Sequence, residues 1–519
     1  MTAPGTDSGS VQAAPQVTGF AATMTVIAMG LGYSVSYADP IILSANISEV
    51  REGLDMTGST ASFVASLATL ALAAAVLGAG ALGDLYGKKR LFVIGLLFSI
   101  GFDVLAAAAP TSLVLMIARA GAGVGFALVL GLSLAIINDV FPPERRAAAI
   151  ALYLGASFAV SAPQPAIGSM LAEHFGWRAG FLVAPVVAVI TLVLTLVYVP
   201  ETLRSVRKLD LFGLASVAVA LVALVFGISR LEQGLEPVSV IPIVVGLVAG
   251  AAFVYRELHT PDPALDLRIF RSRQFTVAVT AGAVYNFLTG GTTILIAYYI
   301  VAVRAESPAL LGLLLVPATV LQAIAATGAG RAGERFGDRA VLIVGLSLLL
   351  AGLLMLTILD ENTSTFVLFI AVALNAVGGA VVQTPQSTIM MASAPAELGG
   401  AVAAAKPATG QAAYSLGPTL FALVGATLFL HDGLPKLDGS GITESEAREA
   451  LRVAHGGTTS SAGGTNVLDP EHAQKVVEGA TDSMLYAIHT LGLIMAVVPL
   501  VTIVCSLILL PSKASAKDV

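Results

Sequence analysis

Three ionisable side chains lie inside long apolar segments in the first half of the sequence, where a charge is costly. Asp39 lies late in the first apolar segment, Asp103 late in the third, and Arg119 early in the fourth. A charge at the centre of a bilayer costs about 2.5–3.5 kcal/mol, so each of these residues needs a physical reason. Counting from the segment ends places Asp39 and Arg119 at similar depths, roughly 10–12 Å at 1.5 Å per residue. A carboxylate beside a guanidinium could hold and release a proton.

Two interpretations of this charge group stay open. In the first, protonation of Asp39 releases Arg119, and movement of a substrate or a helix follows. In the second, the two residues form a static ion pair that only fixes helix packing. We favour the proton site, because acids inside a membrane are costly to keep for packing alone. Asp103 lies nearer the outer surface, where it either joins this proton-coupling site or is simply hydrated.

A charged turn occurs twice, at positions 80–90 and 330–340, and the two copies are 250 positions apart. Each copy has a glycine, an acid four residues later, a second glycine three residues after that, and then basic residues. The first copy supplies Gly80, Asp84, Gly87, Lys88, Lys89 and Arg90, and the second supplies Glu334, Gly337 and Arg339. Glycine permits the tight turn, and the basic residues can meet an acid such as Asp139. A turn duplicated at half the chain length predicts two related halves.

The composition places the chain in a membrane. Of its 519 residues 56% are hydrophobic and 12% are charged, and a soluble domain could not bury so much apolar surface. A helix needs about 20 apolar residues to cross the hydrocarbon layer. Breaks at charges, Pro and Gly give fourteen candidate spans, near 19–47, 61–83, 91–109, 112–138, 147–171, 179–199, 211–229, 237–255, 274–302, 309–328, 340–359, 365–391, 400–430 and 484–510.

We therefore predict an all-α polytopic membrane protein. Two six-helix bundles related by pseudo-twofold symmetry would enclose an inserted pair of helices, which gives 14 transmembrane helices. The expected divisions are a disordered cytoplasmic tail (1–18), an N-terminal bundle (19–199), a central insertion with its cytoplasmic linkers (200–273), a C-terminal bundle with an extracellular loop at 431–482 (274–510), and a second cytoplasmic tail (511–519).

Basic residues in the connections favour one side of the membrane. Seventeen Lys and Arg residues lie on the side of the 80–90 turn, and four lie in the short loops opposite. By the positive-inside rule the first side, with both termini, is cytoplasmic. In the outer loop, positions 443–446 form a capping box and Asp469-Pro470 predicts a second helix start.

The second half lacks an equivalent of the charge pair, so we expect ion coupling in the first half. Polar and aromatic side chains of both halves are candidates for a substrate cavity, although each polar group could instead bond a neighbouring helix. The candidate lining residues are Tyr33, Ser36, Tyr37, Phe158, Asn286, Gln322, Asn375 and Gln383. Gly32, Ser36 and Asp39 also recur at helical spacing, a stripe that suits the wall of a cavity.

Several function classes are excluded or disfavoured. The formal net charge of −6 argues against a nucleic-acid partner. A single cysteine, Cys505, allows neither an intramolecular disulfide nor a thiolate metal site. No phosphate-cradling loop surrounds the Gly-Lys dipeptide at 87–88, so ATP hydrolysis is not expected. Since histidines and membrane acids are scattered, we predict no enzyme, no metal and no cofactor, with the proton gradient as the driving force.

These features resemble the major facilitator superfamily, and within it the fourteen-helix drug/proton antiporter branch, over nearly the whole chain. Positions 80–90 are similar to the signature loop between helices two and three, which implies a cytoplasmic latch. Positions 119–125 resemble the Arg-containing motif of helix four, assigned in the family to proton transfer, and Asp39 stands where the branch has its helix-one acid. The segment from Gly155 to Ser169 resembles the helix-five antiporter motif through Gly155, Pro163, Gln164, Pro165 and Gly168. Gln164 and Ser169 stand where the motif has glycines. The resemblance implies that Gln164 adds a polar group to the cavity.

The predicted function is a proton-coupled secondary transporter that exports amphipathic or lipophilic small molecules, as multidrug efflux antiporters do in antibiotic resistance. The alternatives are a proton symporter that imports a nutrient, and a transporter of lipids or lipid precursors on the same fold. The altered helix-five motif keeps import open. Apart from a small-molecule substrate and membrane lipids we expect no partner, and so a monomer in a bacterial plasma membrane.

Overall fold

The computed structural model describes residues 19–201, 210–231, 234–260, 263, 265–307, 309–393, 399–436 and 470–511. Within these ranges the regular structure is helical and contains no strand. The predicted tail at 1–18, positions 512–519 of the predicted tail at 511–519, and the predicted capping box at 443–446 lie outside the described residues.

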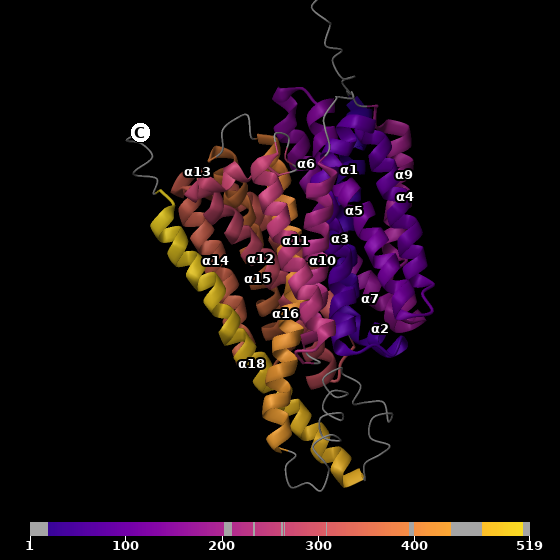
Figure 1. The fold of residues 1–519 in the computed structure, drawn as a ribbon, viewed down its shortest axis with the longest axis vertical. Helices are drawn as coiled ribbons and strands as arrows, with labels where there is room; N and C mark the ends of the chain where they lie inside the picture. The colour runs from indigo at the N-terminus through magenta and orange to yellow at the C-terminus, as the bar shows by residue number, and fades with distance from the viewer. Residues whose placement is uncertain are drawn as a thin grey trace, which may run out of the picture.

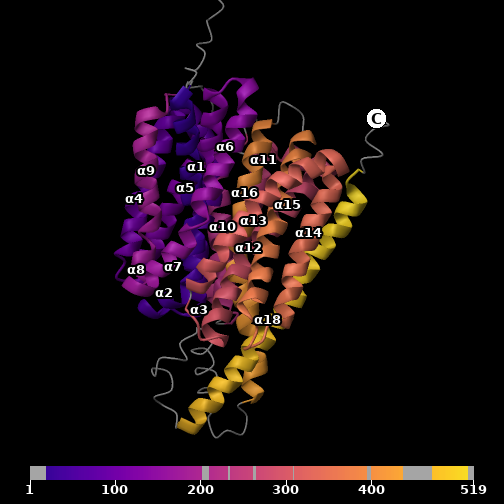
Figure 2. The same cartoon turned by 180° about the vertical axis from the view of Figure 1, so that it is seen from behind.

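The first half of the chain is a bundle of long helices with short connections (Figure 1). Its elements are α1 (Gly19–Ala45), α2 (Ile47–Gly53), α3 (Gly58–Tyr86), α4 (Lys88–Ala107), α5 (Ser112–Val140), α6 (Pro143–Ser161), α7 (Gln164–Phe175), α8 (Trp177–Gly180) and α9 (Val183–Tyr198). The short helices α2 and α8 lie at the end of the bundle opposite to the start of α1 (Figures 1 and 2).

A helical pair and a second bundle follow. The pair is α10 (Leu211–Arg230) and α11 (Pro237–His259). The second bundle contains η2 (Leu267–Arg271), α12 (Arg273–Tyr298), η3 (Tyr299–Val303), α13 (Ala309–Phe336), α14 (Asp338–Met355), η4 (Leu356–Ile358), α15 (Thr365–Ala392), α16 (Gly399–Lys436) and α18 (Pro470–Leu509).

Thirteen of the described helices are long and apolar enough to cross a membrane. The remaining predicted span, 147–171, is divided between α6 and α7 at Ala162 and Pro163. Proline lacks the backbone N–H that continues a helix, and Pro165 stands in the first turn of α7, where proline is tolerated. With this broken helix counted as one crossing, the structure confirms the all-α polytopic class.

The two halves repeat their local geometry as well as their sequence. Gly87 ends α3 with φ 98° and ψ 124°, and Gly337, 250 positions later, ends α13 with φ 90° and ψ 146°. Thr111 caps α5 through a hydrogen bond from the Val114 N–H, and Ser364, 253 positions later, caps α15 in the same way. A positive φ strongly favours glycine. The glycine repeated in the two sequence motifs therefore corresponds to the same turn in both halves.

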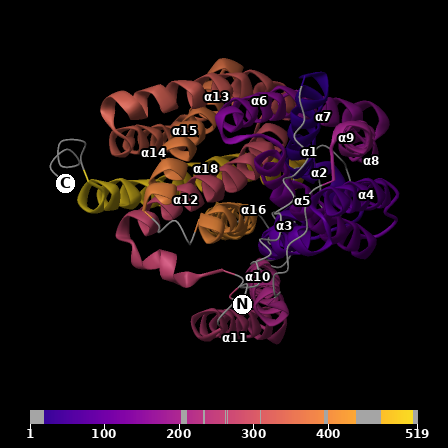
Figure 3. The same ribbon diagram turned by 90° about the horizontal axis from the view of Figure 1, so that it is seen from above.

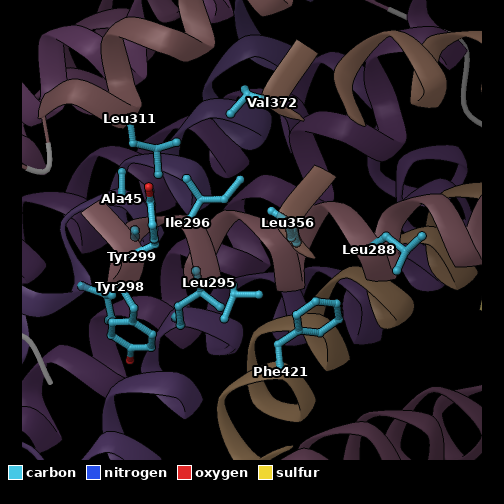
Figure 4. Packing of buried hydrophobic residues seen from close by; sticks show 14 of the residues in the cluster. Ala45, Leu288, Leu295, Ile296, Tyr298, Tyr299, Leu311, Leu356, Val372 and Phe421 are labelled. Atoms are coloured by element: carbon cyan, nitrogen blue, oxygen red, sulfur yellow. The ribbon is translucent and has the colours of Figure 1, made fainter. Parts of the chain in front are cut away.

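The halves are sealed against each other at one end. We call the end where α1 begins and α18 ends the terminal end, and the opposite end the distal end (Figure 1). At the distal end Ala45 and Ile47 share a buried cluster with Tyr299 and Leu311 of the second half (Figure 4). A Cβ on Gly312 of α13 would lie 2.8 Å from the Pro165 carbonyl oxygen of α7. Backbones approach this closely only where glycine lacks a side chain, so the α7–α13 contact closes the distal side.

The pair α10 and α11 lies beside the two bundles rather than between them (Figure 3). It contacts the first bundle through α10, where Phe226 packs edge-on against Phe63 of α3 at 5.1 Å between ring centroids. Asp210 caps α10 and also accepts from Arg256 Nε at 3.2 Å. Asp210 therefore has a structural role, because it caps the start of α10 and links α10 to α11.

Helices α16 and α18 extend past the distal ends of their neighbours (Figures 1 and 2). Lys436 Nζ lies 2.7 Å from Asp432 Oδ2 and 3.9 Å from Asp482 Oδ2, which links the two helices there. α16 continues to Lys436, and α18 begins at Pro470, the helix start that Asp469-Pro470 predicts, so both helices extend into the predicted outer segment 431–482.

Candidate functional site

The three membrane charges of the first half meet in one cluster. Arg119 Nη1 of α5 lies 2.6 Å from Asp39 Oδ2 of α1 and 3.9 Å from Asp103 Oδ1 of α4. Asp103 and Arg119 are 0% exposed and Asp39 is 1% exposed. The expectation that Asp103 might be hydrated near the outer surface is wrong, since α4 turns this side chain into the bundle. We call Asp39, Asp103 and Arg119 the charge triad.

The surroundings of the triad leave hydrogen-bonding capacity unused. Ser99 Oγ donates to Asp103 Oδ2 at 3.2 Å, and the guanidinium lies over the Phe181 ring at 5.6 Å. Among the described residues, no partner satisfies Arg119 Nε or Nη2, or Asp103 Oδ1. A buried donor or acceptor without a hydrogen-bond partner lowers the free energy of unfolding. The triad therefore differs from a structural ion pair in which every polar atom is hydrogen-bonded.

The charges of the triad do not balance. Two ionised carboxylates and one guanidinium give the enclosed cluster a net charge of −1, and a buried, uncompensated charge costs several kcal/mol. One added proton makes the cluster neutral. Because Asp39 and Asp103 both interact with Arg119, their protonation is coupled, and the two carboxylates share the added proton.

The triad does not face the space between the halves. Tyr33, Tyr37 and Ile41 follow one face of α1, and Asp39 lies on the opposite face, about 200° from Tyr37 at about 100° per residue. The small stripe that contains Asp39 packs inward, since a Cβ on Gly32 would lie 2.8 Å from Phe92 of α4 and Val129 of α5. The sequence predicted the stripe correctly but assigned it to the wall of a cavity, which is wrong.

A cavity of about 50 Å3 lies on the other face of α1, between the two halves. Three predicted residues line it, namely Tyr37, Gln322 and Asn375. Asn375 accepts from Thr289 Oγ1 at 3.0 Å and donates to Thr292 Oγ1 at 3.1 Å. Drug-sized ligands occupy about 300–1,000 Å3, so the cavity must widen before it can hold one.

The other predicted cavity residues do not line this cavity. Tyr33 packs against Phe158 at 6.4 Å between ring centroids, one helical turn from Tyr37. Ser36 is 4% exposed and donates to the Gly32 carbonyl at 3.3 Å, on the inward face of α1. Asn286 donates to the Gly282 carbonyl at 2.8 Å, and the Gln383 carbonyl accepts from Ser387 Oγ at 2.9 Å. For Ser36 the cavity assignment is wrong, because its neighbours belong to the first bundle.

The helix-five residues have separate structural positions. Pro163 lies at the break between α6 and α7, and Pro165 reaches the cavity. Gln164 is 2% exposed and donates to Ser34 Oγ of α1 at 3.1 Å, so the expectation that it adds a polar group to the cavity is wrong. Gly168 packs on Ile42, where an added Cβ would lie 2.6 Å from Cγ2, whereas Gly155 has open space around it.

The turn between α3 and α4 brings its charges together at the terminal end. Lys88 Nζ lies 2.5 Å from Asp139 Oδ2 of α5 and 3.3 Å from Asp84 Oδ1. Lys88 begins α4 and Asp139 nearly ends α5, so each charge stands at the unfavourable pole of its own helix dipole. Their pairing offsets both penalties and holds the ends of α3, α4 and α5 together.

The remaining residues of the two charged turns make fewer contacts. Lys89 Nζ donates to the Leu196 carbonyl at 3.4 Å, and Arg90 is exposed. Gly80 has open space where a Cβ would stand. In the second turn Arg339 Nη2 donates to the Leu507 carbonyl at 2.6 Å. Glu334 also has an interaction partner.

We expect Gly87→Ala to destabilise the protein, while Gly101→Ala does not. Gly87 has φ 98° and ψ 124°, a conformation that costs another residue about 1–3 kcal/mol. Gly101 lies within α4 with open space beside it, where alanine favours the helix by about 0.5–1 kcal/mol. Thermal unfolding of both purified variants measures the difference, and equal melting temperatures would contradict the strained turn.

One charged residue of the membrane helices escaped the sequence analysis. Lys406 of α16 donates from Nζ to Ser387 Oγ of α15 at 2.5 Å. It lies inside the predicted span 400–430, so a search of every predicted span for lysine would have found it. The second half therefore has an ionisable group of its own, although not a copy of the triad.

Comparison with known proteins places this geometry in a family. The family model of the Major Facilitator Superfamily matches residues 29–418. Multidrug resistance protein Stp of Mycobacterium tuberculosis is 30% identical over 410 residues, which cover 78% of this chain and 75% of Stp. Multidrug efflux pump LfrA of Mycolicibacterium smegmatis is 29% identical, with 75% and 77% covered. The tetracenomycin C resistance and export protein of Streptomyces glaucescens is 25% identical, with 95% and 92% covered.

Solved structures share the fold at low sequence identity. A bacterial homologue of the human lysosomal transporter Spinster, in an inward-facing and unoccupied conformation, aligns with a TM-score of 0.63 at 15% identity, covering 96% of this chain and all of that one. A POT family transporter in complex with 5-aminolevulinic acid aligns with a TM-score of 0.62 at 14% identity, covering 96% and 99%. The duplicated bundles, the paired turns and the family match agree: this multi-pass membrane protein belongs to the Major Facilitator Superfamily and is a transporter rather than an enzyme.

Proposed function

We propose that the protein exports amphipathic small molecules across a bacterial plasma membrane in exchange for protons. The relatives named above are resistance and efflux proteins, which supports export. The observation that carries the coupling is the charge triad, an enclosed cluster with two carboxylates and one guanidinium. We further propose that the terminal end faces the cytoplasm, in accordance with the distribution of Lys and Arg.

The triad would couple protons to substrate through α1. Tyr37 and Ile41 line the cavity, and Asp39 lies between them in sequence on the opposite face. When one proton neutralises the triad, Arg119 loses part of its attraction to Asp39, and α1 gains freedom relative to α4 and α5. That movement changes the cavity wall, because the same helix supplies both faces. The proton and the substrate therefore influence each other without sharing a binding site.

Gating would use the close contact at the distal end. In the described structure α7 and α13 meet at Pro165 and Gly312, and the cavity beside them is too small for a drug-sized molecule. Export requires this contact to separate, so that the cavity opens toward the distal side. The break at Ala162 and Pro163 places a flexible joint directly before the moving segment.

The direction of coupling can be tested with the purified protein in liposomes. Ethidium, methyl viologen and tetracenomycin C serve as probes, and a pH difference is imposed in either direction. An antiporter accumulates a probe in vesicles that are acidic inside, whatever the orientation of the inserted protein. Accumulation only when the outside is acidic would identify a symporter and overturn the proposal.

A further inference from the structure

Lys406 is a charge in the membrane that the proposed coupling does not use. It lies seven residues after the first residue of α16, roughly 10 Å along the helix at 1.5 Å per residue. A lysine within a spanning helix costs about 2.5–3.5 kcal/mol unless it finds a partner or water. Its side chain is half-buried.

The recorded contacts of Lys406 leave its charge uncompensated. Nζ donates to Ser387 Oγ at 2.5 Å, and Ser387 in turn donates to the Gln383 carbonyl at 2.9 Å. No carboxylate among the described residues lies within 4.0 Å of Nζ. An ammonium group has three donors, so two remain for an acceptor that carries negative charge.

Two further amide side chains, Gln386 and Asn286, lie where α12 packs against α15 and α16, near this lysine in the helices. Gln386 precedes Ser387 on α15 and is 2% exposed. Its Oε1 has no hydrogen-bond partner in the described part of the chain. The side chain of Asn286 faces Gly410, one turn beyond Lys406, where a Cβ would lie 3.1 Å from Nδ2. We call Lys406, Ser387, Gln386 and Asn286 the Lys406 cluster. The Ser387 hydroxyl and the Asn286 amide already donate to backbone carbonyls, so an anion would be bound by the two remaining N–H donors of the ammonium.

The position of the cluster relates it to the cavity between the halves. Ala376 of α15 lines that cavity, and Ser387 lies eleven residues nearer the terminal end, roughly 16 Å at 1.5 Å per residue. Pro385 and Pro407 interrupt the hydrogen-bond ladders of α15 and α16 beside the cluster. Along the helices, the ammonium therefore lies between the terminal end and the cavity, whose lining combines tyrosines, hydroxyl and amide groups and apolar side chains.

We propose that the Lys406 cluster binds the anionic group, a carboxylate or a phosphate, of an amphipathic ligand whose apolar part points toward the cavity. This inference rests on the proposed transport function for its role, but not for its test, because binding is measured without transport. The anion comes either from a soluble substrate or from a lipid headgroup. In both cases the attraction is a charge-assisted hydrogen bond, which a neutral analogue of the same shape does not form.

Binding of a matched pair of probes tests the proposal. Pyrenebutyrate carries a carboxylate, and its methyl ester is the neutral analogue, so fluorescence titration of the purified protein compares charge at nearly constant shape. We expect Lys406→Gln to weaken binding of the acid by roughly tenfold or more and to leave binding of the ester unchanged. Lys406→Arg should retain the preference for the acid. Lys436→Gln, which removes a lysine of the same helix far from the cluster, should change neither affinity.

Other outcomes overturn the proposal. Equal weakening of both probes in Lys406→Gln means that the lysine supports the fold, and no weakening of either means that it does not recognise anions. Repeating the titration in phosphatidylcholine nanodiscs with and without phosphatidylglycerol separates the two sources of the anion. Competition by phosphatidylglycerol in the wild type but not in Lys406→Gln assigns the site to a lipid headgroup, and absence of competition assigns it to a soluble ligand.

Discussion

Asp39→Asn is expected to abolish proton-driven accumulation of substrate while the protein still exchanges substrate across the membrane. In the wild type the triad has two carboxylates and one guanidinium, so the cluster becomes neutral when it takes up one proton. With asparagine at position 39, Asp103 and Arg119 already balance, and no proton is required. The variant therefore imitates the protonated state permanently.

The expected loss of substrate accumulation in Asp39→Asn can be calculated. A difference of one pH unit is worth about 1.4 kcal/mol for each proton, which supports about tenfold accumulation of an uncharged substrate exchanged for one proton. Asp39→Asn should reduce this accumulation to the level of protein-free vesicles. Exchange of labelled against unlabelled substrate, without a gradient, should continue. Asp55→Asn at the exposed distal end is the matched control and should behave as the wild type. An Asp39→Asn protein that accumulates substrate fully would remove the triad from the mechanism.

Arg119→Met is expected to cause a large loss of stability. Removing the guanidinium leaves two carboxylates enclosed without a cation, and breaking a buried pair in this way costs about 3–5 kcal/mol. The Phe181 ring also loses its cationic neighbour. The melting temperature of the purified protein and the yield of monodisperse material measure the effect.

A rescue experiment separates this charge effect from lost packing. If the unpaired acids cause the loss, then Asp39→Asn combined with Asp103→Asn in the Arg119→Met background should restore most of the stability. If the loss comes from the shape of the missing side chain, the added substitutions restore nothing. Arg119→Met with wild-type stability would show that the acids are solvated, contrary to their burial.

The sequence was sufficient for the architecture because apolar length and charge are one-dimensional signals. The duplicated turns around Gly87 and Gly337 carry a conformational requirement that glycine alone meets easily, so the repeat could be recognised in the residues themselves. The pairing of Asp39 with Arg119 followed from matched depths in two helices. Depth along a helix is available from residue counts, whereas rotation about the helix axis is not.

The errors in the site, apart from the omission of Lys406, concern rotation about a helix axis or burial. The stripe of Gly32, Ser36 and Asp39 was identified, yet its direction depended on which neighbours α1 packs against. Gln164 was assigned to the cavity for the same reason, although it bonds Ser34 inside the first bundle. Asp103 joined the triad because α4 places it against Arg119, a contact that no spacing within one segment could reveal. Lys406 needed no structure and was simply missed.

If the charge triad exchanges a proton for substrate, the proton itself can be followed. Vesicles containing the purified protein and an internal pH dye receive substrate on the outside, and the change of internal pH is recorded. We predict that substrate entry releases protons outward through the wild type, seen as internal alkalinisation, and that Asp39→Asn shows substrate movement without any pH change. Alkalinisation of equal size in wild type and Asp39→Asn would contradict the account.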